Sequence, residues 1–409
     1  MPEGDMRILP SAYAEPCGMV GTTRIGRGDR RVLKRKLAAV AVIVGASCGS
    51  YALAESGVKP GEIVIGQSAS LTGNQAEIGQ QVRDGALAYF EVVNRNGGVN
   101  GRKIRLITLD DAGNTEKGEA NTKQLIEQDK VLLLFCYTGR NTSEKALPLV
   151  EKHDIPFFGA ATGGASIHGS FNRNVINVRA SYDLETQALV RYLVSTGQSK
   201  IGFIFHKDDL KKSNLKMTED AAATHGLKLA GSAQVDRNST DVKEAVGIMS
   251  KLNPDAVITN AAIKPLGEFV RQMRKAGATN QFLSVSFVGT PIVKELGVDS
   301  AGLIMAQVVP LPTRRQIPIV GEYHRALATV GAKPEYSFNG LEGFITAKVL
   351  VEGLQRTGKD VTRAKFIKAI ESIGDWDLGG YHVGYSPTNH NGSKYVDITV
   401  INRQGLFLN

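Results

Sequence analysis

The sequence is poor in cysteine and has no apolar run long enough to suggest a membrane span. Its 409 residues include three cysteines, Cys17, Cys48 and Cys136. Removal of an N-terminal leader would leave only Cys136, which excludes an intramolecular disulfide. We expect this thiol to be buried and structural, since it ends an apolar stretch. The apolar segment 37–46 is about half of the ~20 residues that a spanning helix needs.

The N-terminal segment has the three parts of an export signal. A cationic stretch, 30–36, precedes the apolar stretch 37–46, and the Ala-Leu-Ala of 52–54 fits cleavage before Glu55. Residues 1–54 are therefore predicted to be a cleavable leader, and the mature chain is predicted to be exported. A membrane anchor is disfavoured by the length of the apolar stretch. Lipid attachment at Cys48 remains a minor alternative, because Gly45 replaces the usual branched residue.

The excess of basic residues is small once the leader is set aside. The formal net charge is +9, and eight Lys/Arg against four Asp/Glu in residues 1–54 account for four of these charges, leaving +5. No basic cluster interleaved with aromatics occurs in the remainder, which excludes a nucleic-acid partner. The composition, 42% hydrophobic and 22% charged, is typical of a soluble globular protein, and the length suits two or three domains.

Signatures of catalysis and of metal or cofactor binding are missing. A G-x-S-x-G motif, the signature of a hydrolase nucleophile, occurs at 45–49 but lies inside the leader. Neither a Walker lysine loop nor a G-x-G-x-x-G follows the first strand, and the seven histidines show no metal-ligand spacing. His206 follows a strand, but we interpret it as a surface or core histidine and not as a base. We interpret Asp110 and Asp111 as a solvated strand end that caps the next helix. No enzyme, cofactor or metal is predicted.

Strand-like and helix-like segments alternate along the chain. Two series are separated near residue 180, and prolines after the segment 301–312 suggest a crossing linker. This alternation predicts parallel α/β sheets in two similar lobes. The expected strands are 63–68, 103–111, 131–135, 155–158, 175–181, 200–205, 227–235, 255–260, 281–287, 379–385 and 394–401, and three late helices are expected near 317–330, 338–355 and 363–372.

Two polar turns follow neighbouring strands. The first is 139–142 and the second lies in 159–166. Because open α/β sheets bind ligands at the carboxyl ends of their strands, these turns are candidate ligand contacts. Gly139 permits a close backbone approach, and free N–H groups at a helix start favour a carboxylate or another anion. One such turn is more often only a helix cap, but two in a two-lobed chain indicate a cleft.

Ordered motifs carry a family resemblance. GQSASLTGN, GGVNGRKIRLITLDDAGN and YTGRNTSEKALPLVEKHDIPFFGAATGG, continuing through NVRASYDLE, PDAVITN and LEGFITAKVL, resemble the periplasmic branched-chain amino-acid-binding proteins. These are the type I solute receptors of ABC transporters, and the resemblance spans about 61–402. It implies an α/β fold of two Rossmann-like lobes joined by three crossovers, with 61–180 plus 310–376 in lobe 1 and 181–309 plus 377–409 in lobe 2. It also implies hinge closure on a small molecule and delivery to ABC permease subunits.

The resemblance also implies where the ligand lies. The carboxylate-holding turn of the family falls on 139–142, and a second carboxylate contact falls on Ala160 and Thr162. The acidic residue with which relatives pair an α-ammonium group is replaced by Ser286. Since a buried unpaired ammonium is costly, we expect a small organic acid without one, an aromatic acid being one form. Positions that are aromatic in relatives are Ile78, Leu210 and Ala262 here.

The predicted ligand contacts come from both lobes. Asp208 could bind a hydroxyl or amine of the ligand, so an amino-acid ligand remains the alternative. Arg140 is either a ligand contact or part of a surface salt bridge. Lys207 and Lys264 are expected to be solvent-exposed. A sensory module on the same fold is the other alternative. The full set is Ser68, Ser70, Leu71, Arg140, Asn141, Thr142, Ala160 and Thr162 on lobe 1, with Tyr182, Asp208 and Ser286 on lobe 2.

Overall fold

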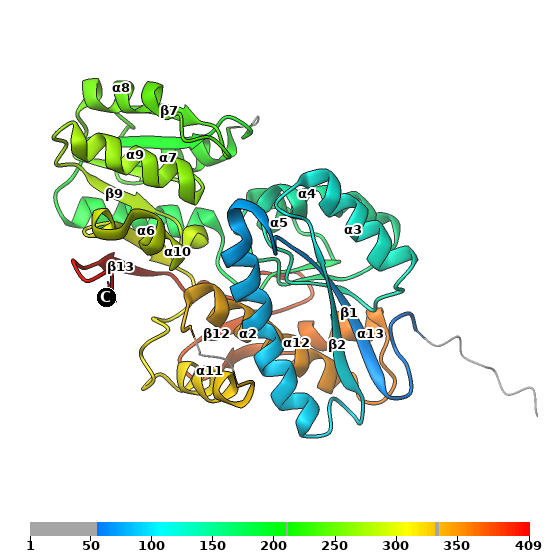
Figure 1. Ribbon diagram of the computed structural model, residues 1–409. Coiled ribbons are helices and arrows are strands. Elements are labelled where there is room, and N and C mark those ends of the chain that lie inside the picture. Colours follow the sequence, from blue (N-terminus) through cyan, green and yellow to red (C-terminus); the bar gives the residue numbers. More distant parts are fainter. Residues whose placement is uncertain (1–54, 210–211, 332–334) are drawn as a thin grey trace, which may run out of the picture. The chain divides into compact units, whose positions relative to one another are not determined.

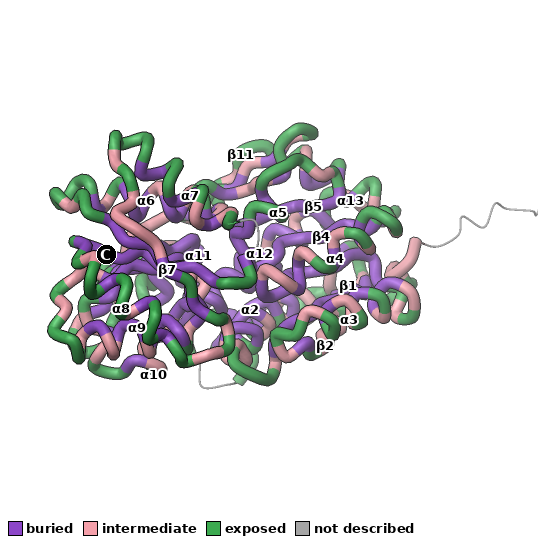
Figure 2. The backbone as a smooth tube through the Cα atoms, turned by 90° about the horizontal axis from the view of Figure 1, so that it is seen from above, coloured by how far each residue is buried: buried purple, intermediate pink, exposed green. Residues whose placement is uncertain are grey.

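The computed structural model describes residues 55–209, 212–331 and 335–409 (Figure 1). The predicted leader, 1–54, and Leu210 lie outside the described residues. Within residues 55–409, two separate sheets form the centres of two α/β lobes, as the sequence predicts. The residues of the strands are mostly buried in both sheets, and the exposed residues lie mainly on outward-facing turns of the helices and in loops (Figure 2).

Lobe 1 is built on a five-stranded parallel sheet in the order β2-β1-β3-β4-β5. Three of its strands are only two residues long, and two of these, β3 and β4, lead into the polar turns. Asn114 caps α3, its side-chain oxygen accepting from the Lys117 N–H at 2.8 Å. The elements are β1 (Glu62–Ala69), η1 (Gly73–Gln75), α2 (Ala76–Arg95), β2 (Lys103–Asp110), α3 (Thr115–Glu127), β3 (Leu134–Phe135), α4 (Arg140–Lys152), β4 (Phe157–Phe158), α5 (Ala165–His168) and β5 (Val175–Ile176).

Lobe 2 contains a seven-stranded sheet in the order β14-β13-β10-β9-β8-β6-β7. Its first five strands in chain order, β6 to β10, are parallel, but β13 joins β10 antiparallel and β14 joins β13 antiparallel. The elements are α6 (Tyr182–Ser195), β6 (Ile201–His206), α7 (Ser213–Ala223), β7 (Gly231–Val235), α8 (Lys243–Leu252), β8 (Ala256–Thr259), α9 (Ile263–Lys275), β9 (Gln281–Ser284), η2 (Ser286–Val288), α10 (Pro291–Leu296), η3 (Gly297–Ser300), β10 (Ile304–Gln307), β13 (Asp397–Ile401) and β14 (Phe407–Leu408).

The chain passes between the lobes three times, and the last passage lies later than predicted. After β10 it returns to lobe 1 for α11 (Pro318–Thr329), α12 (Phe338–Arg356), α13 (Arg363–Glu371) and the hairpin of β11 (Gly374–Asp377) and β12 (His382–Tyr385). The predicted boundary at residue 377 is therefore corrected to about 395. The physical reason is that Tyr381 and Tyr385 are buried in the lobe 1 core, where the Tyr385 hydroxyl donates to the Asn177 carbonyl at 2.9 Å.

Helices α2 and α12 of lobe 1 approach very closely. Ile78, Val82, Ala86 and Phe90 of α2 are buried, as their helical spacing predicts. The close approach depends on glycine, since a Cβ on Gly343 would lie 2.0 Å from the Val82 carbonyl oxygen. The absence of a side chain at Gly343 therefore permits the short distance between the two helices.

We expect Gly343→Ala to destabilise the protein by about 1–3 kcal/mol, because overpacking outweighs the ~1 kcal/mol gain in helix propensity. Gly247→Ala in α8 is the matched control, since a Cβ there meets no atom within 4 Å. It should leave stability unchanged or raise it. Urea unfolding monitored by circular dichroism measures both, and equal midpoints for the two variants would contradict the close-packing explanation.

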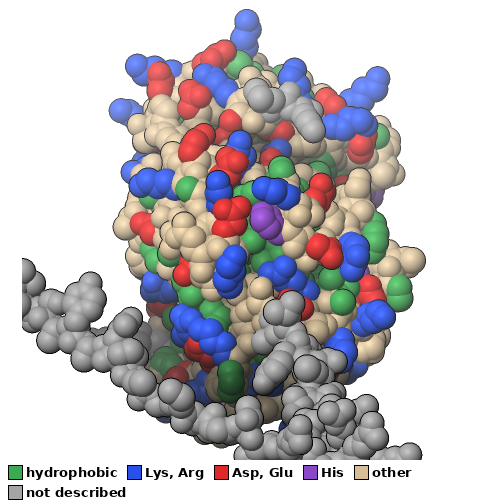
Figure 3. All heavy atoms as spheres, turned by 90° about the vertical axis from the view of Figure 1, so that its right-hand side faces the viewer, with side chains coloured by type: hydrophobic (Ala, Val, Ile, Leu, Met, Phe, Trp, Pro, Cys, Tyr) green, Lys and Arg blue, Asp and Glu red, His purple; other side chains and the backbone are tan. Residues whose placement is uncertain are grey.

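The charges on the molecular surface are mixed in sign. On the face shown in Figure 3, Lys and Arg side chains are interspersed with Asp and Glu. Among the described residues, none of the helices combines the length and the apolar character needed to cross a membrane. Cys136 is fully buried, as predicted, and burial raises the pKa of its thiol.

Candidate ligand-binding cleft

The first polar turn begins with an unusual backbone conformation. Cys136 follows β3 with a φ of 48°, and Gly139 follows with a φ of 88°, so the chain turns sharply before α4. The Gln67 side chain donates to the Cys136 carbonyl at 2.9 Å. The Thr142 hydroxyl donates to the Thr138 carbonyl at 2.7 Å. These bonds stabilise the strained turn from inside the lobe and leave Arg140 and Asn141 directed outward.

The loop after β1 is held by the two aspartates that end and follow β2. Asp111 is fully buried and accepts from the hydroxyls of Ser68 and Ser70, at 2.8 and 2.9 Å. Burial raises the pKa of Asp111, opposed by these hydrogen bonds. Asp110 accepts from the Leu71 N–H at 2.8 Å. The predicted helix cap is thus wrong for both aspartates, because Asn114 caps α3, and the predicted solvation is wrong for Asp111, whose buried carboxylate organises the loop.

The second polar turn lies directly beside the first. A bridge pairs Thr138 with Ala161, and the stem of Arg140 crosses Gly164, where a Cβ would lie 3.2 Å from the arginine Cγ. Ala160 is buried, and the Thr162 hydroxyl accepts from the Gly164 N–H at 3.4 Å. The two predicted turns therefore form one surface at the carboxyl edge of the lobe 1 sheet.

Polar contacts join this surface to lobe 2. Asn141 donates to the Asp208 carboxylate at 3.1 Å, and Arg140 approaches Asp209 at 3.3 Å while its Nε donates to Glu144 at 2.7 Å. The Asp208 carboxylate also accepts hydrogen bonds from Nε and Nη2 of Arg237, at 2.8 and 2.9 Å. Burial alone would raise the pKa of Asp208, but the Arg237 hydrogen bonds and charge lower it to about 2. The lobes are thus bridged by charged groups at the site of the predicted ligand.

A small, partly open pocket is lined by the two arginines of these contacts. It is a cavity of about 30 Å³, which would hold about two water molecules. Admission of an organic ligand therefore requires the lobes or the side chains to move apart. Its walls combine cationic, amide and aromatic groups, namely Arg140, Tyr182, His206, Asn214, Arg237, Asn260, Val285 and Phe287.

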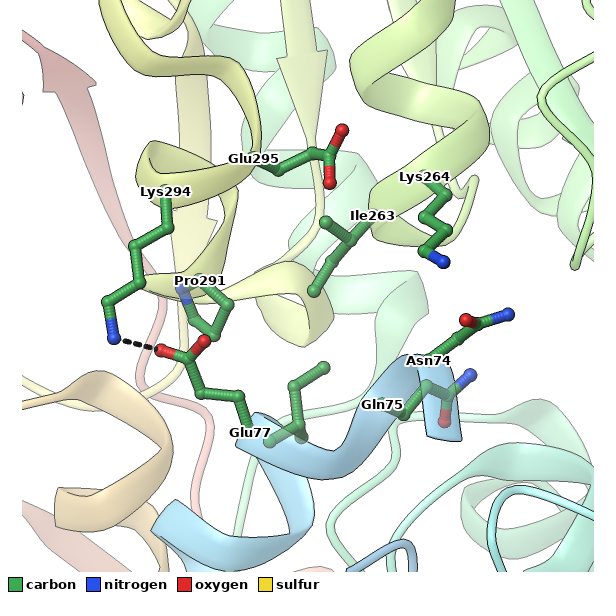
Figure 4. Close-up of a pocket in the computed structure, with 9 residues that line it drawn as sticks. Asn74, Gln75, Glu77, Ile263, Lys264, Pro291, Lys294 and Glu295 are labelled. Atoms are coloured by element: carbon green, nitrogen blue, oxygen red, sulfur yellow. Dashed lines mark hydrogen bonds and ion pairs between the residues drawn. The ribbon is translucent and has the colours of Figure 1, made fainter. Parts of the chain in front are cut away.

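Two further cavities continue the cleft. One shares Arg140, Arg237 and Phe287 with the first and is lined by the turn 139–142. The other, of about 230 Å³, lies where the start of α2 faces α9 and α10 (Figure 4). There Glu77 pairs with Lys294 at 2.6 Å across the opening. Ile78 and Lys264 line this outer space, whereas Lys207 is exposed and pairs with Asp236.

Ser286 belongs to a buried ionic network at a crossover. Arg179 donates to Glu185 at 2.5 Å, to the Ser286 hydroxyl at 2.6 Å and to Glu342 at 3.3 Å. Glu185 in turn accepts from the Ser286 N–H at 2.6 Å. Burial raises the pKa of both glutamates, and the Arg179 charge opposes this shift. The network joins α6 and η2 of lobe 2 to α12 of lobe 1 through the crossover residue Arg179.

The predicted contacts fall into three groups. Arg140, Asn141, Thr142 and Tyr182 line the cavities. Ser68 lies in the last part of β1, and Ser70, Leu71, Ala160, Thr162 and Asp208 lie in the loops that carry or adjoin these walls. Ser286 lies between two lining residues, with its hydroxyl bound in the ionic network. Sequence reasoning missed Arg237 and Asn260 as cavity residues. Asn260 had a usable signal, since it directly follows a predicted strand of lobe 2.

Two α/β lobes with a polar cleft at their strand tips define a two-lobed ligand-binding protein. A family model described as periplasmic binding protein matches residues 62–405. The chain therefore belongs to the periplasmic binding protein family. Within the residues that the structure describes, no group of three or more Cys, His, Asp or Glu side chains is arranged to hold a metal.

Individual relatives agree with this assignment. An amino-acid-binding protein of Pseudomonas aeruginosa is 26% identical over 67% of this chain and 71% of its own length. A substrate-binding periplasmic protein of Ralstonia solanacearum is 32% identical, with a TM-score of 0.79 over 85% of this chain and 99% of its own. A possible leucine/isoleucine/valine-binding protein of Rhodopirellula baltica is 29% identical, with a TM-score of 0.80 over 88% and 98% of the two chains.

Proposed function

We propose that this protein is the exported receptor of an ABC importer and that it binds a small organic carboxylate without an α-ammonium group, preferably an aromatic one. The observation that carries this proposal is the composition of the two inner cavities. Arg140 and Arg237 line them together with Tyr182 and Phe287, and no carboxylate side chain is among their described lining residues. A guanidinium group binds a carboxylate by charge-assisted hydrogen bonds.

The acidic residues near the cleft already have cationic partners. Asp208 is bound by both Nε and Nη2 of Arg237, and Asp209 accepts from the N–H groups that begin α7 while it faces Arg140. Glu185, which contacts Ser286, is bound to Arg179. An α-ammonium group would have to compete with one of these arginines for its carboxylate, and at the buried Arg179–Glu185 pair this would leave an unpaired buried charge. A ligand carboxylate, in turn, binds Arg140 or Arg237 by sharing the guanidinium group with its present acidic partners, Glu144 and Asp209 or Asp208.

Solved structures provide examples of several ligand classes on this fold. A solute-binding protein of R. palustris, solved in complex with benzoate, has a TM-score of 0.75 at 14% identity, a likeness that extends to the fold alone. The amino-acid-binding relative represents the alternative, a conventional branched-chain receptor. The cavity lining described above favours the organic acid for this chain.

The proposed mechanism is hinge closure. The ligand carboxylate binds at the turn 139–142 of lobe 1, and lobe 2 then covers it with Tyr182 and Phe287. The closed form is delivered to the permease subunits. The proposed leader, 1–54, exports the chain, and the family assignment supports a periplasmic location.

We expect Arg140→Gln to weaken binding of an aromatic carboxylate such as benzoate about 10- to 100-fold, because hydrogen bonds to charged groups contribute ~1.5–3 kcal/mol. Isothermal titration calorimetry with the wild-type protein and the variant measures this change. Arg191→Gln, an exposed arginine on α6, is the matched control and should bind as the wild type does.

The same titration decides between the two ligand classes. Leucine and valine are titrated beside benzoate and phenylacetate. Tight binding of leucine with no heat from either acid would overturn the organic-acid proposal and leave the branched-chain receptor. Binding of the acids that is independent of Arg140 would remove the anion-binding role of the turn 139–142.

A further inference from the structure

Asn260 lies at the centre of the ligand-facing edge of lobe 2. It directly follows β8, which is flanked in the sheet by β6 and β9. His206 ends β6 and Val285 follows β9, and both line the same inner cavity as Asn260. This is the position, at adjacent parallel strand ends, where open α/β sheets contact their ligands.

The side chain of Asn260 has no hydrogen-bond partner among the residues that the structure describes. Both its amide nitrogen and its amide oxygen are shielded from solvent, and neither makes a hydrogen bond to the described residues. Buried amide groups are almost always paired, because an unpaired donor or acceptor loses its water without compensation. Exchanging the nitrogen and oxygen positions would not remove the problem, since both atoms lack partners.

The neighbouring groups do not satisfy this amide. The His206 Nε2 accepts from the Ala262 N–H at 2.9 Å, so the ring proton lies on Nδ1. Burial, together with the Arg237 charge, lowers the pKa of His206 to about 4, and the ring is therefore neutral near pH 7. Tyr182, Val285 and Phe287 provide the less polar part of the remaining wall, and Arg140, Asn214 and Arg237 provide its polar part. Asn260 is thus an unpaired donor and acceptor in a mixed wall, beside the likewise unpaired His206 Nδ1.

We propose that Asn260 recognises a polar group at the end of the ligand opposite its carboxylate. The group that uses both amide atoms is a hydroxyl, which donates to the oxygen and accepts from the nitrogen. The ligand class is then a hydroxylated aromatic carboxylate. Its carboxylate lies on the lobe 1 turn, its ring lies between the aromatic walls, and its hydroxyl lies at Asn260. This inference rests on the proposed function, because it assigns the second end of the same ligand.

The test compares benzoate with 4-hydroxybenzoate by calorimetry. We expect the wild-type protein to bind 4-hydroxybenzoate about 3- to 10-fold more tightly than benzoate, because this is the gain in affinity that one net hydrogen bond provides. Asn260→Leu, similar in shape and unable to form hydrogen bonds, should abolish this ratio while benzoate binding persists. Asn260→Asp keeps an acceptor for the hydroxyl and should retain part of the preference. Gln234→Ala, an exposed amide on β7, is the matched control and should keep the whole ratio.

Each outcome has a separate meaning. A wild-type ratio of one means that water alone occupies the site and overturns the Asn260 assignment, while the proposed function survives. A ratio that persists in Asn260→Leu overturns it as well. If neither acid binds the wild-type protein, the proposed function fails first. An unchanged melting temperature of Asn260→Leu shows that a lost ratio does not come from unfolding.

Discussion

Replacing Arg179 by methionine should lower the free energy of unfolding by about 3–5 kcal/mol, the range observed when one partner of a buried ion pair is removed. Arg179 is 3% exposed and is the cation between Glu185 and Glu342. Its loss leaves two buried carboxylates without a positive partner. The burial of both glutamates already raises their pKa, and in the variant the loss of the opposing Arg179 charge should raise it further.

A compensating variant makes this result specific. If the loss comes from unpaired charge, the triple variant Arg179→Met, Glu185→Gln, Glu342→Gln should recover part of the stability, because it carries no ionised group at the network. Arg191→Met on the surface of α6 should change stability by less than about 0.5 kcal/mol. Urea unfolding measures all three. A triple variant no more stable than Arg179→Met would show that the side-chain volume, and not the charge, is what matters.

The protein should lose about 3 kcal/mol of stability between pH 6.5 and pH 4 through His168 alone. Burial lowers the pKa of His168 from 6.5 to about 4, with the Arg179 charge adding to the effect. In this window the unfolded state binds the proton and the folded state does not, so stability falls as the pH falls and changes no further below about 4. The magnitude follows from ~1.4 kcal/mol per pKa unit.

The measurement compares variants and not absolute curves, because the buried glutamates with raised pKa act in the opposite direction. His168→Gln can keep the contact that His168 Nε2 makes with the Thr162 carbonyl at 3.0 Å, without a titrating ring. The difference in unfolding free energy between the two proteins should depend on pH only between about 6.5 and 4. His225→Gln, at an exposed position, is the control and should leave the pH dependence as it is. Parallel curves for wild type and His168→Gln would contradict the prediction.

Much of the fold could be predicted because its signals are local. The helical spacing from Ile78 to Phe90 gives α2, and the apolar alternation of 103–111 gives β2. The C-terminal passage could not be predicted in the same way. Of the hairpin of β11 and β12 only the second strand was predicted, as 379–385, and the packing of Tyr381 and Tyr385 against lobe 1 decides which lobe the hairpin joins.

The site was predictable where backbone and position define it. Residues 139–142 follow a strand of a parallel sheet, so topology alone places them at the cleft. Partners of long side chains are a different matter. That Arg237 binds Asp208, or that Ser286 is bound by Arg179, depends on side chains far apart in the sequence. No local pattern records those distances.

The buried position of Cys136 has a practical consequence. In a chain that begins at Glu55, this is the only thiol in the sequence, and labelling reagents cannot reach it while the protein is folded. Thiols introduced at Asn74 of lobe 1 and Asn238 of lobe 2, whose amides approach to 3.5 Å, would therefore be the sole reactive ones. Fluorescent dyes at these two positions would report opening and closing of the lobes directly, with no background from a native sulfhydryl.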